Sequence, residues 1–145
     1  MNVIGIDGTG DIVPEPDWSS LFNDELEILA AKEHWRRVTT ELKDRTLMAP
    51  GNAHGLQRLV VSYVLYDRAL RTVAEKGPVE PPKRGSKNAI ARLSPFFVAM
   101  REMASDAATL EAEFGLAPRR RAAATKADNG KKTQRAADRF LRSIS

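Results

Sequence analysis

Few side chains in this sequence have the type and spacing that catalysis or metal binding requires. The two histidines, His34 and His54, are neither at helical spacing nor beside clustered carboxylates, and the chain has no cysteine. A metal site needs imidazoles, thiolates and carboxylates that the fold can bring together. Serine catalysis needs a base, commonly with a Gly-x-Ser-x-Gly turn, and the sequence has no such turn. We therefore expect no metal, no cofactor and no enzymatic activity.

Two further groups of residues have simple explanations. The glycines between Gly5 and Gly10 resemble a phosphate-binding loop, but such a loop needs a preceding strand, a following helix and a Lys-Ser/Thr pair. The sequence lacks all three, so we interpret this stretch as part of a flexible arm. Glu25, Glu27 and Glu33 lie close together beside lysines and arginines. We interpret these glutamates as a solvent-exposed helix face.

The main chemical signal is positive charge at one end of the chain. Residues 119–145 contain nine Lys or Arg and two Asp, a net charge of +7. Residues 1–118 contain 14 basic and 17 acidic side chains, a net charge of −3. A basic extension on a mildly acidic body predicts binding to a polyanion.

The candidate phosphate contacts form two clusters. The tail contains Arg119, Arg120, Arg121, Lys126, Lys131 and Lys132. A proline-rich connector contains Lys83, Arg84 and Lys87, with Arg92 nearby. Contacts to phosphates give binding that depends steeply on salt and carries little sequence information. Ordinary surface charge is the alternative interpretation of both clusters.

The end of the tail has a second possible use. Residues 133–144 predict a short amphipathic helix with Phe140, Leu141 and Ile144 on its apolar side. A helix of this length is unstable alone in water. We therefore expect it to fold on a partner, which competes with the use of the tail for DNA.

A first helix is predicted over residues 24–45. Asn23 is the expected N-cap, because its side chain can accept a hydrogen bond from a free amide at the helix start. Apolar residues at alternating spacings of three and four indicate one buried stripe. This stripe comprises Ile28, Ala31, Trp35, Val38 and Leu42, and the opposite face carries Lys32, Glu33, Arg36, Arg37 and Lys43.

A second helix is predicted over residues 53–76, after a turn at residues 48–52. Gly77 and Pro78 should end it, since glycine relaxes the last turn and proline cannot continue a helix. The predicted buried stripe comprises Leu56, Leu59, Tyr63, Tyr66, Leu70 and Val73.

Residues 77–92 predict an extended or hairpin-like connector, too rich in proline for a central strand. The third helix should begin at Pro95 with Ser94 as its N-cap, and should end at Gly115. Its predicted stripe comprises Phe96, Met100, Met103, Ala107, Leu110 and Phe114.

These elements predict an all-α fold of three main helices, a helical hairpin plus a third long helix. We expect a flexible arm over residues 1–17, a helical core over 18–118 and a basic tail over 119–145. The sustained heptad-like spacing favours additional packing between subunits. No apolar stretch approaches the ~20 residues that cross a bilayer, and no signal peptide is evident. We therefore expect a soluble cytoplasmic protein.

The order of these features resembles a known family. Pro16-Asp17-Trp18 precedes a helix with Trp35 and Leu42, the second helix ends at Lys76-Gly77, and Ser94-Pro95 opens the last helix. That helix closes with Phe114-Gly115-Leu116-Ala117-Pro118 followed by three arginines. Over about residues 14–121 the chain resembles the P27-type family of phage terminase small subunits. The last helix of that family runs from Asn-Pro to Leu-Gly-Leu-Thr-Pro-x-x-Arg, so Ser94, Phe114 and Ala117 depart from its pattern.

The resemblance implies a non-catalytic subunit that recognises double-stranded viral DNA in the host cytoplasm. It also implies a homo-oligomeric ring, such as a nonamer, and a large terminase subunit that supplies the ATPase and nuclease.

Two other functions fit parts of the sequence. A helix-turn-helix regulator would read DNA with exposed polar residues of the second helix, namely Gln57, Arg58, Ser62, Asp67, Arg68 and Arg71. The length of that helix fits this motif poorly. A structural virion or scaffold protein would have no DNA role at all.

Overall fold

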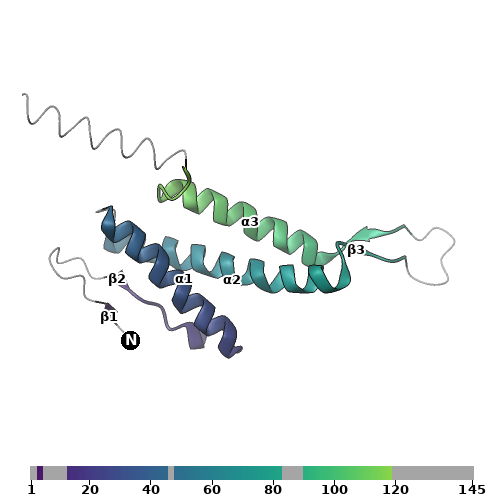
Figure 1. Cartoon of the computed structure of the whole chain (residues 1–145), viewed down its shortest axis with the longest axis horizontal. Coiled ribbons are helices and arrows are strands. Elements are labelled where there is room, and N and C mark those ends of the chain that lie inside the picture. The colour runs from purple at the N-terminus through teal and green to yellow at the C-terminus, as the bar shows by residue number, and fades with distance from the viewer. Residues whose placement is uncertain (1–2, 5–12, 46–47, 83–89, 119–145) are drawn as a thin grey trace, which may run out of the picture. The chain divides into compact units, whose positions relative to one another are not determined.

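A computed structural model describes residues 3–4, 13–45, 48–82 and 90–118 (Figure 1). The chain divides into two compact units, residues 1–110 and residues 111–145. The boundary between them falls inside the last helix. The predicted tail and its amphipathic segment, and the glycines between Gly5 and Gly10, lie outside the described residues.

Helix α1 (Glu25–Asp44) begins one residue later than predicted. Its N-cap is Asp24, not Asn23, because the Asp24 carboxylate accepts a hydrogen bond from the Leu26 amide at 2.8 Å. Either side chain can cap a helix start, and a carboxylate also interacts favourably with the positive end of the helix dipole. Glu25 in the first turn and Lys43 in the last turn have the charges that this dipole favours.

The buried face of α1 confirms most of the predicted stripe. Ala31, Trp35, Val38 and Leu42 are buried, and Ile28 is half-buried. The predicted outer face is exposed throughout. The 3.6-residue period of the helix therefore accounts for the orientation of α1.

Helix α2 (Ala53–Lys76) has the predicted bounds and follows a short 3₁₀ turn, η2 (Pro50–Asn52). It lies beside α1 in the first unit (Figure 1). The predicted stripe is right for Leu56 and Leu59, which are fully buried. Beyond them it is wrong, because Tyr63 and Tyr66 are half-buried and Leu70 is 39% exposed. The buried face instead comprises Leu56, Leu59, Val60, Ser62, Val64 and Ala69.

This correction has a simple physical cause. Apolar residues occur on two neighbouring faces of α2, and periodicity alone does not say which face meets α1. The tyrosine hydroxyls favour an edge position with access to water, whereas valine has no polar atom to satisfy.

Gly77 ends α2 as predicted. Its backbone has φ +83° and ψ 166°, a conformation that side chains with a Cβ rarely adopt. The Gly77 amide donates a hydrogen bond to the Val73 carbonyl at 2.7 Å. This bond satisfies one of the carbonyls that a helix end leaves without a partner.

The connector begins and ends as a narrow antiparallel ribbon, which confirms the hairpin-like prediction at its described ends. Strand β3 (Val79–Glu80) pairs with β4 (Arg92–Leu93), so that Val79 faces Leu93 and Glu80 faces Arg92. The Ser94 amide donates to the Pro78 carbonyl at 2.9 Å and closes the ribbon. The chain therefore leaves α2 and returns to the start of the next helix at nearly the same place.

Helix α3 (Pro95–Glu113) begins at the predicted proline. Ser94 is its cap, since the hydroxyl accepts from the Phe96 amide at 3.2 Å. Of the predicted stripe, Ala107 and Leu110 are buried, whereas Met100 and Met103 are half-buried. Phe96 is 47% exposed, so burial of the whole predicted stripe is not confirmed within the chain.

The second unit begins at the end of α3. Gly115 has φ +72°, and the Leu116 amide donates to the Glu111 carbonyl at 2.8 Å. This geometry confirms that the helix ends at Gly115, because glycine adopts positive φ without a steric cost.

The described residues of the predicted N-terminal arm, 3–4 and 13–17, include two short strands. Strand β1 (Val3–Ile4) pairs with β2 (Val13–Pro14), and Val13 is buried. A 3₁₀ turn, η1 (Trp18–Ser20), follows. Trp18 is buried with its ring edge against Trp35 of α1, at a centroid distance of 5.9 Å and an angle of 64°. An edge-to-face pair of this kind adds about 0.5–1.5 kcal/mol to the burial of the rings.

The fold is therefore all-α, with two short ribbons as accessories. Among the described helices, none combines the length and apolar character that crossing a bilayer requires.

Candidate functional site

Most of the residues predicted to bind a partner lie outside the described residues. These are the tail cations Arg119, Arg120, Arg121, Lys126, Lys131 and Lys132, the connector cations Lys83, Arg84 and Lys87, and the apolar residues Phe140, Leu141 and Ile144. The described residues instead define the charges and apolar surfaces of the helical body. Those surfaces determine which functions the body itself can support.

A buried ion pair joins α1 to α2. Arg68 donates to both carboxylate oxygens of Glu27, through Nε at 2.7 Å and Nη2 at 2.6 Å. Arg71 Nη2 lies 3.5 Å from Glu27 Oε1. The Glu27 side chain is 7% exposed, whereas the Arg68 side chain is 52% exposed. Hydrogen bonds from Arg68 hold the pKa of Glu27 below its usual 4.5, although desolvation by burial raises it.

The interpretation of Glu27 as part of a solvent-exposed face is therefore wrong, although Glu25 and Glu33 are exposed. The sequence contained a signal for this burial. Glu27 lies four residues before Ala31, which lies four residues before Trp35, so the three occupy one helix face. A buried carboxylate needs a cationic partner, and the sequence alone does not identify Arg68 as that partner.

The ion pair also bears on the helix-turn-helix alternative. That alternative requires Ser62 and Arg68 to be available on the surface of α2. Ser62 is 6% exposed and donates a hydrogen bond to the Arg58 carbonyl at 2.9 Å. The Nε and Nη2 atoms of Arg68 donate hydrogen bonds to the Glu27 carboxylate. The described face of α2 therefore lacks Ser62, and two of the three guanidinium nitrogens of Arg68 are already bound to Glu27.

The exposed cations of α1 are partly neutralised by a neighbour on the same helix. Glu33 accepts hydrogen bonds from Arg36 at 2.7 and 3.1 Å and from Arg37 at 3.5 Å. These bonds lower the pKa of Glu33, chiefly through Arg36. Surface pairs of this kind contribute little to stability, but they reduce the positive charge that α1 presents to a polyanion.

His34 contributes to the same helical hairpin. Its Nε2 lies 3.7 Å from Asp67 Oδ2, and its ring centroid lies 5.0 Å from that of Tyr63. His54 is exposed at the start of α2. Within the described ranges, no group of three or more His, Asp or Glu is placed to hold a metal ion.

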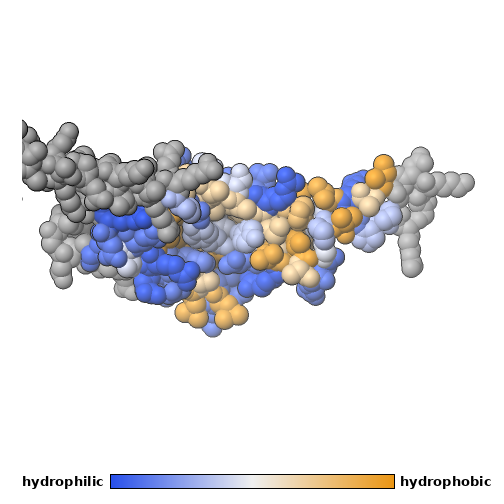
Figure 2. All heavy atoms as spheres, turned by 45° about the horizontal axis from the view of Figure 1, so that its top comes forward, coloured by the Kyte–Doolittle hydropathy of each residue, from blue (hydrophilic) through white to orange (hydrophobic). Residues whose placement is uncertain are grey.

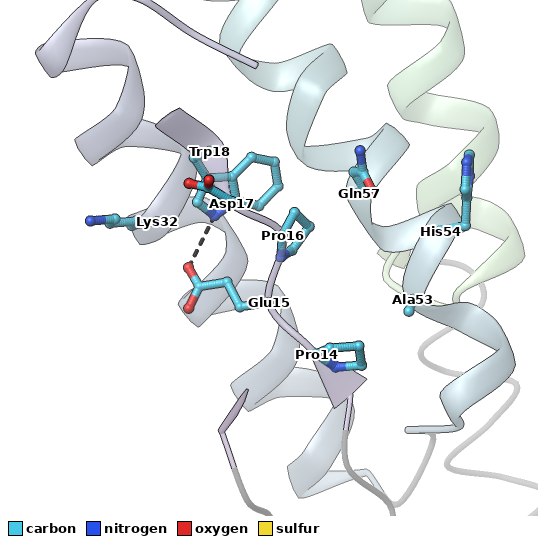
Figure 3. Close-up of a pocket in the computed structure, with 9 residues that line it drawn as sticks. All are labelled: Pro14, Glu15, Pro16, Asp17, Trp18, Lys32, Ala53, His54 and Gln57. Atoms are coloured by element: carbon cyan, nitrogen blue, oxygen red, sulfur yellow. Dashed lines mark hydrogen bonds between the residues drawn. The ribbon is translucent and has the colours of Figure 1, made fainter. Parts of the chain in front are cut away.

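A hollow of about 750 Å³ lies where the segment before η1 runs between α1 and the start of α2 (Figure 3). The Trp18 indole nitrogen donates to Glu15 at 3.0 Å beside it. Lys32 is its basic residue, and Glu15 and Asp17 are its acidic ones. Because both signs of charge line the hollow, it offers no continuous positive surface to phosphates. The lining residues are Pro14, Glu15, Pro16, Asp17, Trp18, Lys32, Ala53, His54 and Gln57.

Apart from Leu70, the exposed large apolar side chains among the described residues lie in two segments of the first unit. Figure 2 shows that hydrophobic side chains gather at more than one place on the face in view. One segment is the start of α1 with the turn before it, where Leu21, Leu26 and Leu29 are 48%, 68% and 60% exposed. The other is the β3–β4 ribbon and the start of α3, with Val79, Ile90, Leu93, Phe96 and Val98 exposed. The first segment was not predicted from the sequence, because its leucines lie outside the predicted stripe.

Comparison with known proteins identifies the family. No curated protein and no solved structure shows significant similarity to this chain. The family model described as the small subunit of phage terminase matches residues 31–131. The match extends from the first helix into the basic tail, and it overlaps most of the region on which the predicted resemblance was based. Since it covers more than half of the chain, the protein belongs to the family of phage terminase small subunits.

Proposed function

We propose that this subunit of the phage packaging machinery recognises viral DNA and regulates the large terminase subunit, which supplies the ATPase and nuclease. The observation that carries the DNA part is the separation of charge along the chain. Residues 119–145 have a net charge of +7, whereas the rest has a net charge of −3. Because the helical body is net negative, it attracts DNA only weakly. The tail is therefore the main polyanion-binding segment.

The charge pairing in the body supports the same assignment. Arg68 and Arg71 lie against Glu27, and Arg36 and Arg37 lie against Glu33. Cations that already have a carboxylate partner release few counterions when DNA approaches, and counterion release provides most of the affinity for phosphates. Arg119, Arg120 and Arg121 begin six positions after the last residue of α3, so we assign them the main phosphate contacts. Lys126, Lys131 and Lys132 add to them, and Lys83, Arg84 and Lys87 form a second, weaker cluster.

The experiment that tests this proposal compares two variants of equal charge. In one, R119Q/R120Q/R121Q removes three tail cations; in the other, K32Q/R36Q/R37Q removes three cations from the exposed face of α1. Each lost phosphate contact lowers affinity, so the tail variant should bind duplex DNA at least tenfold more weakly at low salt, as measured by fluorescence anisotropy. The α1 variant should stay within a few-fold of the unmodified chain. Equal losses in both variants would refute the assignment to the tail.

The last residues of the tail are proposed to bind the large subunit. Phe140, Leu141 and Ile144 form an apolar set among basic residues, which is typical of a segment that folds on a partner. Replacing all three with serine should abolish co-purification with the large subunit and leave DNA affinity unchanged. Loss of DNA binding with retained co-purification would reverse these roles.

The subunit is further proposed to act as a homo-oligomeric ring in the host cytoplasm, a nonamer being the expected size. The large exposed side chains at the start of α1 and of α3 support assembly, because contiguous apolar surface on a soluble protein indicates an interface. In a ring, the basic tails of all copies lie near one DNA duplex, and modest contacts then add by avidity. A monomeric mass in native mass spectrometry would contradict this proposal.

A further inference from the structure

Residues 13–22 form a strap across the α1–α2 hairpin. Strand β2, at the beginning of the strap, lies against η2 at the start of α2, and the η1 turn lies against α1. Three buried side chains anchor the strap, namely Val13, Trp18 and Phe22. The Trp18 ring meets Trp35 of α1 edge to face, and Cζ of Arg68 on α2 lies 6.0 Å from the centre of the Phe22 ring. The strap therefore binds the hairpin through side-chain contacts at separate points.

The polar groups of the strap find their partners within the strap. The Trp18 indole donates to Glu15, and the Asp17 carboxylate accepts from the amide and the hydroxyl of Ser19 at 3.1 and 2.6 Å. The Ser19 hydroxyl is the largest cause of the lowered pKa of Asp17, whereas the charge of Lys32 on α1 is the smallest. Within the part of the chain that the structure describes, no hydrogen bond or ion pair joins the strap to α1 or α2. The strap therefore keeps these partners when it lifts, and avoids the cost of polar groups left unpaired.

The middle of the strap lies over a hollow. The hollow of about 750 Å³ separates residues 14–18 from parts of both helices (Figure 3). On the helix side it is lined by Lys32, Ala53, His54 and Gln57. Side chains beside a void lose part of the dispersion attraction that a close-packed interior provides. The attraction between strap and hairpin is therefore concentrated at the three anchors.

The hairpin has links of its own that do not pass through the strap. The bidentate pair of Glu27 and Arg68 joins α1 to α2. Leu56, Leu59 and Val60 of α2 are fully buried, and α2 lies beside α1. Lifting the strap leaves the ion pair and the hydrogen bonds of both helices in place. A segment of this kind can open as a separate unit, at a smaller free energy than global unfolding.

We infer that the strap detaches from the hairpin as one unit while α1 and α2 stay folded, so that the chain alternates between a closed and an open state. In the closed state Trp35 is 1% exposed. In the open state the part of its ring that meets Trp18 is in water. Burial of the anchors favours the closed state, and the regained freedom of the strap favours the open state. This inference is independent of the roles proposed for the tail and of the proposed assembly.

Single-cysteine chains measure this opening, since the natural sequence has no cysteine. Val13 in the strap and Val64 in α2 are both 2% exposed, so V13C and V64C are matched probes. Each full-length chain would be labelled with iodoacetamide at urea concentrations below the unfolding transition. We expect V13C to react at least tenfold faster than V64C and to depend less on urea, because releasing the strap exposes less surface than unfolding the hairpin. Equal rates with equal urea dependence would overturn the inference, because the strap would then open only when the whole chain unfolds.

A second pair of variants separates release of the whole strap from fraying at its beginning. In the V13C chain, W18S removes the central anchor, whereas L21S removes a side chain that is 48% exposed. W18S should raise the labelling rate of V13C at least fivefold, and L21S should leave it within twofold. A rate that W18S does not change would overturn the inference, because only the end of the strap would then open. Loss of helix content in the W18S chain, measured by circular dichroism, would also overturn it, because the hairpin would then depend on the strap.

Discussion

Glu27 holds α1 and α2 together through charge as well as shape. Its carboxylate is almost removed from water, and two nitrogens of Arg68 donate to it at 2.6 and 2.7 Å. Hydrogen bonds between ionised partners are stronger than those between neutral ones, and partial shielding from solvent strengthens them further. If one partner is removed, the other is left without the hydrogen bonds that compensated its desolvation. The energetic consequence is therefore larger for Glu27 than for any exposed glutamate of α1.

The E27Q variant tests this residue directly. Glutamine has nearly the same size but no charge, so it cannot form the charged pair with Arg68. We expect the free energy of unfolding to fall by about 1–3 kcal/mol in urea denaturation. The matched control is E33Q, which removes an exposed pair on the same helix and should change stability much less. Equal effects of the two substitutions would show that burial of Glu27 contributes nothing.

The same pair predicts a pH dependence with a definite sign. Because the pKa of Glu27 is lower in the folded chain than its usual 4.5, the unfolded chain takes up a proton first as the pH falls. The stabilisation is therefore fully present above about pH 4.5 and decreases below that value. The difference in unfolding free energy between the natural chain and E27Q should shrink in acid. A difference that stays constant down to the acid unfolding transition would contradict the role of the carboxylate.

At the scale of the element, Gly77 determines where α2 ends and the β3–β4 ribbon begins. Its φ of +83° leaves no strain for glycine, and a Cβ placed there would meet no atom within 4 Å. Any cost of a side chain at this position therefore comes from the backbone conformation alone. Gly51 offers a comparison, since a Cβ there also meets open space and its backbone is not in the positive-φ region.

We therefore expect G77A to lower the free energy of unfolding by about 1–3 kcal/mol, the typical cost of this backbone region for a residue with a Cβ. G51A should be neutral or slightly stabilising, because alanine reduces the freedom of the unfolded chain. Thermal denaturation followed by circular dichroism would measure both. A G77A chain as stable as the natural one would mean that the end of α2 relaxes without cost.

The helix ends and the α1 stripe could be predicted because they depend on neighbours in sequence. Ser94 before Pro95, and glycines at positions 77 and 115, act within one helical turn. The packing of α2 could not be predicted in the same way. Whether Tyr63 or Val60 faces inward depends on the angle at which α1 crosses, and that angle depends on residues distant in sequence.

The candidate site shows the same division. The excess of charge in the tail follows from counting residues, whereas the Glu27–Arg68 pair joins side chains 41 positions apart. The sequence did not single out Leu26 and Leu29, because a helical period identifies the buried face and says nothing of what the other face contacts. The burial of Trp18 also depends on its contact with Trp35 of α1, which no local pattern specifies.

At the scale of the whole molecule, we propose that different parts of the chain have different tasks. Several arginines of the helical body are paired with carboxylates, and its exposed apolar surface is proposed to contact other copies. The basic tail, which the family match includes as far as residue 131, is proposed to bind DNA. Under this proposal the body would assemble without DNA, and DNA binding would respond to salt without loss of the fold.

The central claim is tested most directly by the salt dependence of DNA binding. The full-length chain would be compared with a full-length variant in which Arg119, Arg120, Arg121, Lys126, Lys131 and Lys132 are all glutamine. For duplex DNA, each phosphate contact contributes about 0.9 to the slope of log affinity against log salt. We predict that the slope for the variant is smaller by about 3–5 per subunit engaged, with unchanged helix content and assembly. Parallel slopes would contradict the claim that the tail binds the DNA.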